Sequence, residues 1–180
     1  TKTLIIADGA QISASTESTQ GGEIFLQGLD SLELSKATIS ASSLDGEAGD
    51  IIIKAKDFVN ILNGSKITSE ARGTGKAGFI DINTKNLNIA DASVISVNSQ
   101  QQAGDLLVTA DNVTINNLSK VTAETVSGVS GHIQFKNLQT FQLSRESLIS
   151  ATTVDGEAGD ITINATDEVK IQQDSKIISG

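Results

Sequence analysis

A short motif recurs along the chain every 26–29 residues. It consists of a small residue, a glycine, one further residue, and then a stretch in which every second residue is apolar. The glycines of its six copies are Gly22, Gly49, Gly78, Gly104, Gly131 and Gly159. The hexapeptide DGEAGD occurs at residues 45–50 and again at 155–160, four of these intervals later. Self-similarity at such a period is the sequence signature of a repeat architecture. The 180 residues are therefore expected to form a repeat array.

The apolar residues of each repeat fall into three short pairs in which every second residue is apolar. The pairs of the repeat that begins at Gly49 are Ile51/Ile53, Val59/Ile61 and Ile67/Ser69. The opening residues contain only the second and third pairs of a partial repeat, Leu4/Ile6 and Ile12/Ala14. A spacing of two is the period of a strand with one buried face, and no useful stretch has the helical period of 3.6.

Three strands in each repeat of about 27 residues describe one rung of a parallel β-helix, because stacked rungs bury apolar faces that a single rung leaves exposed. We predict one all-β segment over residues 1–180, with a partial first rung at 1–21 and rungs that start near residues 22, 49, 78, 104, 131 and 159. The alternative is an antiparallel sandwich, which does not require equivalent apolar positions at a constant interval. The opening TKTL, without an initiator methionine, suggests a fragment of a longer chain.

Composition excludes several classes of function. The formal charge of −9 argues against nucleic acid and against an anionic membrane as partners, since both require a basic surface. No apolar run is long enough for membrane insertion, and no signal segment opens the chain. The absence of cysteine excludes disulfides and thiolate metal sites. No cofactor is expected. The acidic net charge fits a secreted or surface-exposed protein.

The phrases SKATISAS, GSKITSEARGTGKAGFIDIN and DGEAGDITINATDEV carry a family resemblance. They resemble the repeats of two-partner-secretion exoproteins, the filamentous-haemagglutinin-like or S-layer family surface proteins of the cyanobacterial type. The resemblance covers essentially the whole chain and rests on turn glycines and strand alternation. It implies a right-handed parallel β-helix, export through an outer-membrane transporter, a Gram-negative cell-surface or secreted location, and an adhesive role. It implies no active site.

Outward positions of the predicted strands contain a candidate patch for partner binding. The residue between the two members of the first pair is apolar at Phe25, Ile52 and Leu107, and Phe79 stands beside the glycine corner. Exposed apolar clusters often mark contact surfaces, so these four residues are expected to contact a glycan or another cell-surface component. The alternative is that a loop or a lateral contact covers them.

The position after each repeat glycine is mostly acidic, and the only histidine, His132, stands there between Asp105 and Asp160 of the neighbouring rungs. Opposite charges across neighbouring strands are favourable, so the charged form of His132 is expected to be favoured. No metal site is expected from one histidine and two carboxylates.

The two DGEAGD copies offer a weak alternative of calcium binding, because Ca²⁺ prefers several oxygen ligands. Their acidic residues are Asp45, Glu47, Asp50, Asp155, Glu157 and Asp160. Glycine and aspartate are also the usual residues of tight turns, and a plain turn is the favoured interpretation.

An outward column of hydroxyl residues lies just after the first apolar residue of the third strand in successive rungs: Ser13, Ser40, Thr68, Ser96, Thr122 and Ser150. Such a column is suited to glycans, so a carbohydrate-binding module is the second functional hypothesis. A polysaccharide-active enzyme is the third, and it is disfavoured because the chain has one histidine, two arginines placed on different edges (Arg72 and Arg145), and no Trp or Tyr. The first hypothesis is a non-catalytic structural or adhesive shaft. Its open backbone edges would favour end-to-end self-association of the fragment.

Overall fold

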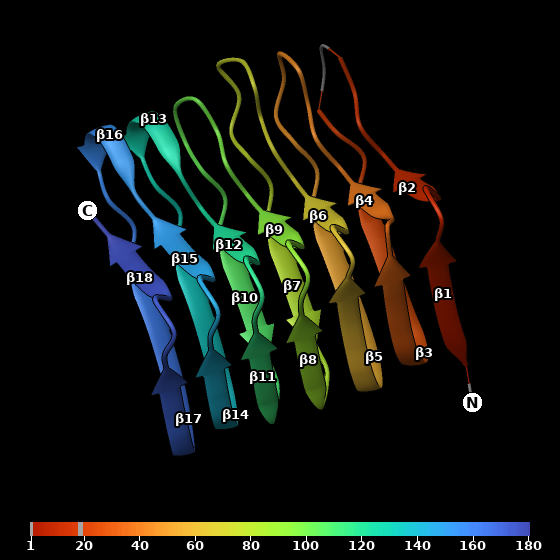
Figure 1. The fold of residues 1–180 in the computed structure, drawn as a ribbon. Helices are drawn as coiled ribbons and strands as arrows, with labels where there is room; N and C mark the ends of the chain where they lie inside the picture. The colour runs from red at the N-terminus through yellow and green to blue at the C-terminus, as the bar shows by residue number, and fades with distance from the viewer. Residues whose placement is uncertain (1, 18–19) are drawn as a thin grey trace.

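The computed structural model describes residues 2–17 and 20–180, so residues 1, 18 and 19 of the predicted partial first rung lie outside the described part. The described residues form only strands, turns and loops, and contain no helix that could span a membrane. The strands stack as a parallel β-solenoid of about 6 turns, with about 28 residues between stacked strands. Figure 1 shows the rungs side by side along one axis, from the N-terminal to the C-terminal end.

Two large sheets make the faces of the solenoid, and a small third sheet lies beside them. The larger sheet contains β1 (Thr3–Ala7), β3 (Ile24–Ser35), β5 (Ile51–Leu62), β7 (Ile80–Asn83), β8 (Asn86–Ile89), β10 (Leu106–Thr109), β11 (Asn112–Ile115), β14 (Ile133–Leu143) and β17 (Ile161–Ile171). The second sheet contains β2 (Gln11–Ser13), β4 (Thr38–Ser40), β6 (Lys66–Thr68), β9 (Val94–Ser96), β12 (Lys120–Thr122), β15 (Leu148–Ala151) and β18 (Lys176–Ser179). The third pairs β13 (Thr125–Val129) with β16 (Thr153–Glu157).

The register of the strands confirms the predicted all-β parallel solenoid. Ile51 pairs with Ile80, and Ile80 pairs with Leu106, so equivalent residues of successive repeats stack directly on one another. Each such column points into one hydrophobic core, where most of its members have no exposed surface. Two aromatic rings in that core, those of Phe135 and Phe141, pack edge to face with their centroids 5.2 Å apart.

The first and second predicted strands are continuous in four rungs and separate in two. They merge into β3, β5, β14 and β17, whereas β7/β8 and β10/β11 remain distinct. The difference follows the sequence, because Ile53 and Val59 stand six positions apart while Ile82 and Leu87 stand only five. The extra residue is accommodated as a bulge, and positive φ angles occur at Gly28 in β3 and Asn137 in β14.

The repeat glycines bring successive backbones into direct contact. A Cβ atom added at Gly78, Gly104 or Gly131 would lie far inside contact distance of the carbonyl oxygen of the repeat glycine one rung earlier. The same collision would occur at Gly49 and Gly159. The glycine period therefore marks a column in which no side chain fits between rungs.

A column of buried serines, which sequence periodicity did not predict, precedes the strands of the second sheet. Ser65, Ser93, Ser119 and Ser147 are all buried. Ser65 Oγ accepts a hydrogen bond from the backbone N–H of Ala37 (3.2 Å), and Ser147 Oγ accepts one from the N–H of Ser119 (3.3 Å). The hydroxyls of Ser65 and Ser147 thus satisfy backbone donors between rungs at a corner where the strand ladder is interrupted, whereas those of Ser93 and Ser119 are buried without a partner among the described residues.

The turn that leads into the second sheet holds left-handed residues in every rung. Positive φ angles occur at its two central residues in Asp8-Gly9 and Asn63-Gly64, and also in Asp91-Ala92 and Asn117-Leu118. Glycine adopts this conformation freely, whereas other L-residues pay about 1–2 kcal/mol. Asn and Asp also tolerate it, so the strain falls on Ala92 and Leu118.

Ala92→Gly is expected to stabilise the protein. Ala92 is exposed and has a φ of 59°, and a glycine after Asp91 would reproduce the natural Asp8-Gly9 turn. We expect the free energy of unfolding to rise by about 0.5 kcal/mol, because relief of the left-handed strain exceeds the added entropy of the unfolded chain. Urea unfolding measures this change. Ala10→Gly, at an exposed position without positive φ, is the control and should destabilise; stabilisation by both variants, or by neither, would contradict the assignment.

The segments between the second sheet and each repeat glycine project from the solenoid and stack on one another. We call residues 42–48, 70–77, 98–103, 124–130 and 152–158 the arm; Figure 1 shows them extending beyond β4, β6, β9, β12 and β15. Parallel bridges join Ser43, Ala71, Ser99 and Thr125 in succession. A region that the sequence indicates only as loops of variable length is thus a regular extension of the solenoid.

The two DGEAGD copies occupy equivalent parts of the arm in different conformations. In the first, Gly46 N–H donates to Ser43 Oγ (2.8 Å) within a bend. In the second, the residues of the DGE portion belong to β16, where Gly156 pairs with Gly128. The local sequence therefore fixes the glycine corner, and the adjacent rung determines whether the preceding residues become a strand.

Candidate binding surfaces

The predicted apolar patch lies on the outer face of the larger sheet, but it is interrupted. Phe25 pairs with Ile52, Ile52 pairs with Asp81, and Asp81 pairs with Leu107. Phe25 is 51% exposed, whereas Ile52 and Leu107 are half-buried. The structure thus brings Phe25 and Ile52 together and separates Leu107 from them by a carboxylate.

Asp81 has an unusual environment for a surface carboxylate. Burial raises its pKa above the ordinary value, while the positive charge of Lys54 acts in the opposite direction. Since the neutral form of a half-buried carboxyl is better tolerated beside apolar residues, acidification would make the column of Phe25, Ile52, Asp81 and Leu107 more uniformly apolar.

Phe79 belongs to the neighbouring column, between Asp50 and Asp105, and is half-buried. Its backbone N–H donates to Asp50 Oδ1 (2.7 Å). Its side chain lines a small hollow of about 260 Å³ together with both aspartates and Lys76. Phe79 therefore borders the patch from a more polar surface, which sequence spacing alone did not distinguish.

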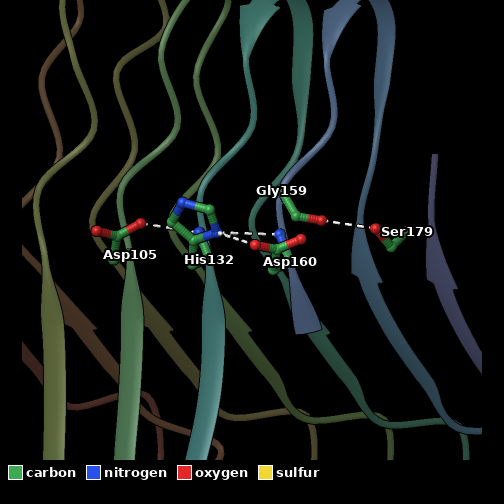
Figure 2. A network of polar contacts seen from close by, with 5 residues as sticks. All are labelled: Asp105, His132, Gly159, Asp160 and Ser179. Atoms are coloured by element: carbon green, nitrogen blue, oxygen red, sulfur yellow. Dashed lines mark hydrogen bonds and ion pairs between the residues drawn. The ribbon is translucent and has the colours of Figure 1, made fainter. Parts of the chain in front are cut away.

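The column that contains His132 serves hydrogen bonding between rungs, as Figure 2 shows. Asp105 Oδ1 accepts from the backbone N–H of His132 (2.8 Å), and His132 Nδ1 accepts from the backbone N–H of Asp160 (3.0 Å). His132 Nδ1 thus joins two neighbouring rungs, and Asp160 Oδ2 stands 3.7 Å from the same nitrogen.

The acidic residues of the two DGEAGD copies do not converge. Within residues 2–17 and 20–180 no three His, Asp or Glu side chains are grouped so that they could hold a metal ion. Asp50 instead uses Oδ1 to accept from Phe79 N–H, and Asp45 and Glu47 are exposed on the arm. The geometry thus gives the weak calcium hypothesis no support.

A hydroxyl-rich groove, which we call the axial groove, lies where the second sheet meets the arm. Its volume is about 660 Å³. It is lined by Gln11, Ser13, Ser15, Thr16, Thr38, Ser40, Ser42, Ser43, Leu44, Lys66, Thr68, Glu70, Arg72 and Val94. The first three members of the predicted hydroxyl column are thus part of a concave surface, and the arm supplies the other wall.

The hydroxyls of the axial groove form a chain of hydrogen bonds across two rungs. Ser15 Oγ and Ser40 Oγ lie 2.9 Å apart, and Ser40 Oγ donates to Ser42 Oγ (3.1 Å). Ser15 Oγ also accepts from the backbone N–H of Ser42 (3.1 Å). These contacts hold the hydroxyl groups in place. Ser15 Oγ and Ser42 Oγ already accept two hydrogen bonds each and donate one, whereas Ser40 Oγ keeps a further acceptor site.

Two charged residues of the arm complete the groove wall. Glu70 Oε1 accepts a hydrogen bond from Ser96 Oγ (2.6 Å), which fixes the carboxylate. Arg72 is exposed, and its guanidinium has no hydrogen bond or ion pair to any residue that the structure describes. Arg145 lies in the left-handed turn between β14 and β15, so the two arginines occupy different edges as the sequence predicted.

The fold defines a parallel β-solenoid repeat protein with an outer apolar patch and an axial groove. Comparison with models of known protein families, with curated proteins and with solved structures finds no match.

Proposed function

We propose that this chain is a structural and adhesive shaft segment of a secreted or cell-surface bacterial protein, without catalytic activity. The observation that carries this proposal is the continuous stacking of equivalent residues, from β1 through β17 and from β2 through β18. Each added rung extends such a solenoid by about 4.8 Å, so repetition converts chain length directly into reach. Export through an outer-membrane transporter belongs to the same proposal, and the resemblance of the repeats to two-partner-secretion exoproteins supports it.

Adhesion through the outer face requires a surface that is apolar and accessible. Phe25 is the most exposed member of the candidate patch, and Ile52 is its direct neighbour across β3 and β5. A glycan ring or another cell-surface component would bury both side chains. A carbohydrate-binding module is the second candidate function, and the axial groove is the observation that favours it.

Retention on intact cells and on a panel of immobilised polysaccharides tests the adhesive role. The double variant Phe25→Ser, Ile52→Ser is expected to lose most of the retention, because it removes the apolar surface while leaving the inward columns unchanged. The matched control is Gln134→Ser, Thr162→Ser, which changes the next two residues of the same outward column beyond Leu107. Equal retention of both variants would contradict adhesion through the patch, and no retention of the natural chain would leave only the spacer role.

A further inference from the structure

We propose that the axial groove binds an extended acidic glycan, with Arg72 contacting a sugar carboxylate and the hydroxyl column contacting sugar hydroxyls. This inference rests on the proposed adhesive function and assigns it a second surface, separate from the apolar patch of Phe25 and Ile52. The groove and the patch lie on different sheets, so variants can test them independently.

The shape of the groove suits an elongated ligand. Its volume of about 660 Å³ lies within the range of small-molecule sites. A second hollow of about 400 Å³ shares Glu70 and Arg72 with it and continues past Asn98, Gln100 and Glu124. Since the bridged arm segments of successive rungs line both hollows, the binding surface follows the solenoid axis. A polymer chain laid along that axis would contact several rungs at once.

The polar groups of the groove match the chemistry of a sugar chain. Each serine or threonine hydroxyl can donate one hydrogen bond and accept others, as a sugar hydroxyl does. The contacts among Ser15, Ser40 and Ser42 orient these groups before a ligand arrives, so less side-chain entropy is lost on binding. The Glu70 carboxylate, which is held in place by its hydrogen bond from Ser96 Oγ, adds a fixed acceptor on the groove wall.

Arg72 selects the acidic member of this ligand class. Arg72 lines the groove, and its guanidinium has no partner among the described residues, in a chain whose formal charge is −9. Arginine and a carboxylate form two parallel charge-assisted hydrogen bonds, a geometry that lysine cannot reproduce. Lys66 on the groove floor adds a second positive charge for a polyanion. A neutral glycan would use the hydroxyl column but would leave Arg72 without a partner.

Binding to polygalacturonate, and to the same polymer with its carboxylates reduced to alcohols, tests this inference. The natural chain is expected to bind the acidic polymer more tightly, and added salt should weaken that preference. Arg72→Gln should weaken binding to the acidic polymer at least tenfold and leave binding to the reduced polymer unchanged. Glutamine suits position 72 because the equivalent position of the next rung is Gln100: Ala71 and Ser99 are bridge partners, and Arg72 and Gln100 are the residues that follow them.

Arg145→Gln is the matched control, because it removes the same charge from a turn outside the groove, where Gln173 has nearly the same φ in the next rung. An equal loss in both variants would mean non-specific charge attraction and would overturn the assignment, as would equal binding of both polymers by the natural chain. Failure of this experiment with patch-dependent cell retention intact would reject the groove alone. Failure of both would reject the adhesive function itself.

Discussion

Gly104→Ala is expected to destabilise the solenoid severely. A Cβ atom at residue 104 would collide with the backbone carbonyl of Gly78, and a backbone neighbour cannot move aside as a flexible side chain does. Two rungs in the middle of the chain would have to separate, which strains the ladders on both sides of the corner. We expect a loss of about 3 kcal/mol or more in the free energy of unfolding, the upper part of the range for overpacked positions.

Gly64→Ala is the matched control, because residue 64 has a φ of 74° but open space around the added methyl group. It should cost about 1–2 kcal/mol through backbone strain alone. Urea unfolding of the two variants separates the effects. A Gly104→Ala variant no less stable than Gly64→Ala would show that the rungs do not meet at this column.

Residue alternation predicted the inward columns because a strand alternates its faces at every residue, whatever lies beyond it. The pairing of Ile51, Ile80 and Leu106 follows from that period and from the glycine interval. The strained turns were harder to predict from the sequence. Asn63-Gly64 signals a left-handed turn, but Asn117-Leu118 adopts the same turn only because the rungs around it impose their geometry.

The binding surfaces show a similar division. The sequence identifies Ser13, Ser40 and Thr68 as an outward column, yet it gives no sign that the arm folds into a wall opposite them. The acidic neighbours of His132 are evident from the sequence, but the hydrogen bond that its Nδ1 accepts from the backbone N–H of Asp160 is not. Charge patterns show which groups lie near each other, whereas the unmet backbone donors of a corner determine which hydrogen bonds form.

Ile82→Asp is expected to unfold the central rungs. Ile82 has no exposed surface and pairs with Ile53 on one side and Val108 on the other. A carboxyl group there would be either charged without a partner or protonated. Either state costs free energy, and the remaining apolar contacts around residue 82 do not compensate for it. We expect a loss of more than about 4 kcal/mol, because the substitution removes a packed side chain and also buries an unsatisfied polar group.

Two neighbouring substitutions decide whether burial of the charge is the cause. Asn83→Asp places the same carboxylate one residue further, on the exposed face of β7, and should change the free energy of unfolding by less than about 0.5 kcal/mol. Ile82→Val keeps the position apolar and should cost about 1 kcal/mol. Thermal melting followed by circular dichroism measures all three variants. Each rung contacts only its neighbours, so damage at Ile82 should split the melting curve into separate transitions for the rungs on either side. A single transition, shifted as little as that of Asn83→Asp, would refute the inward register of β7.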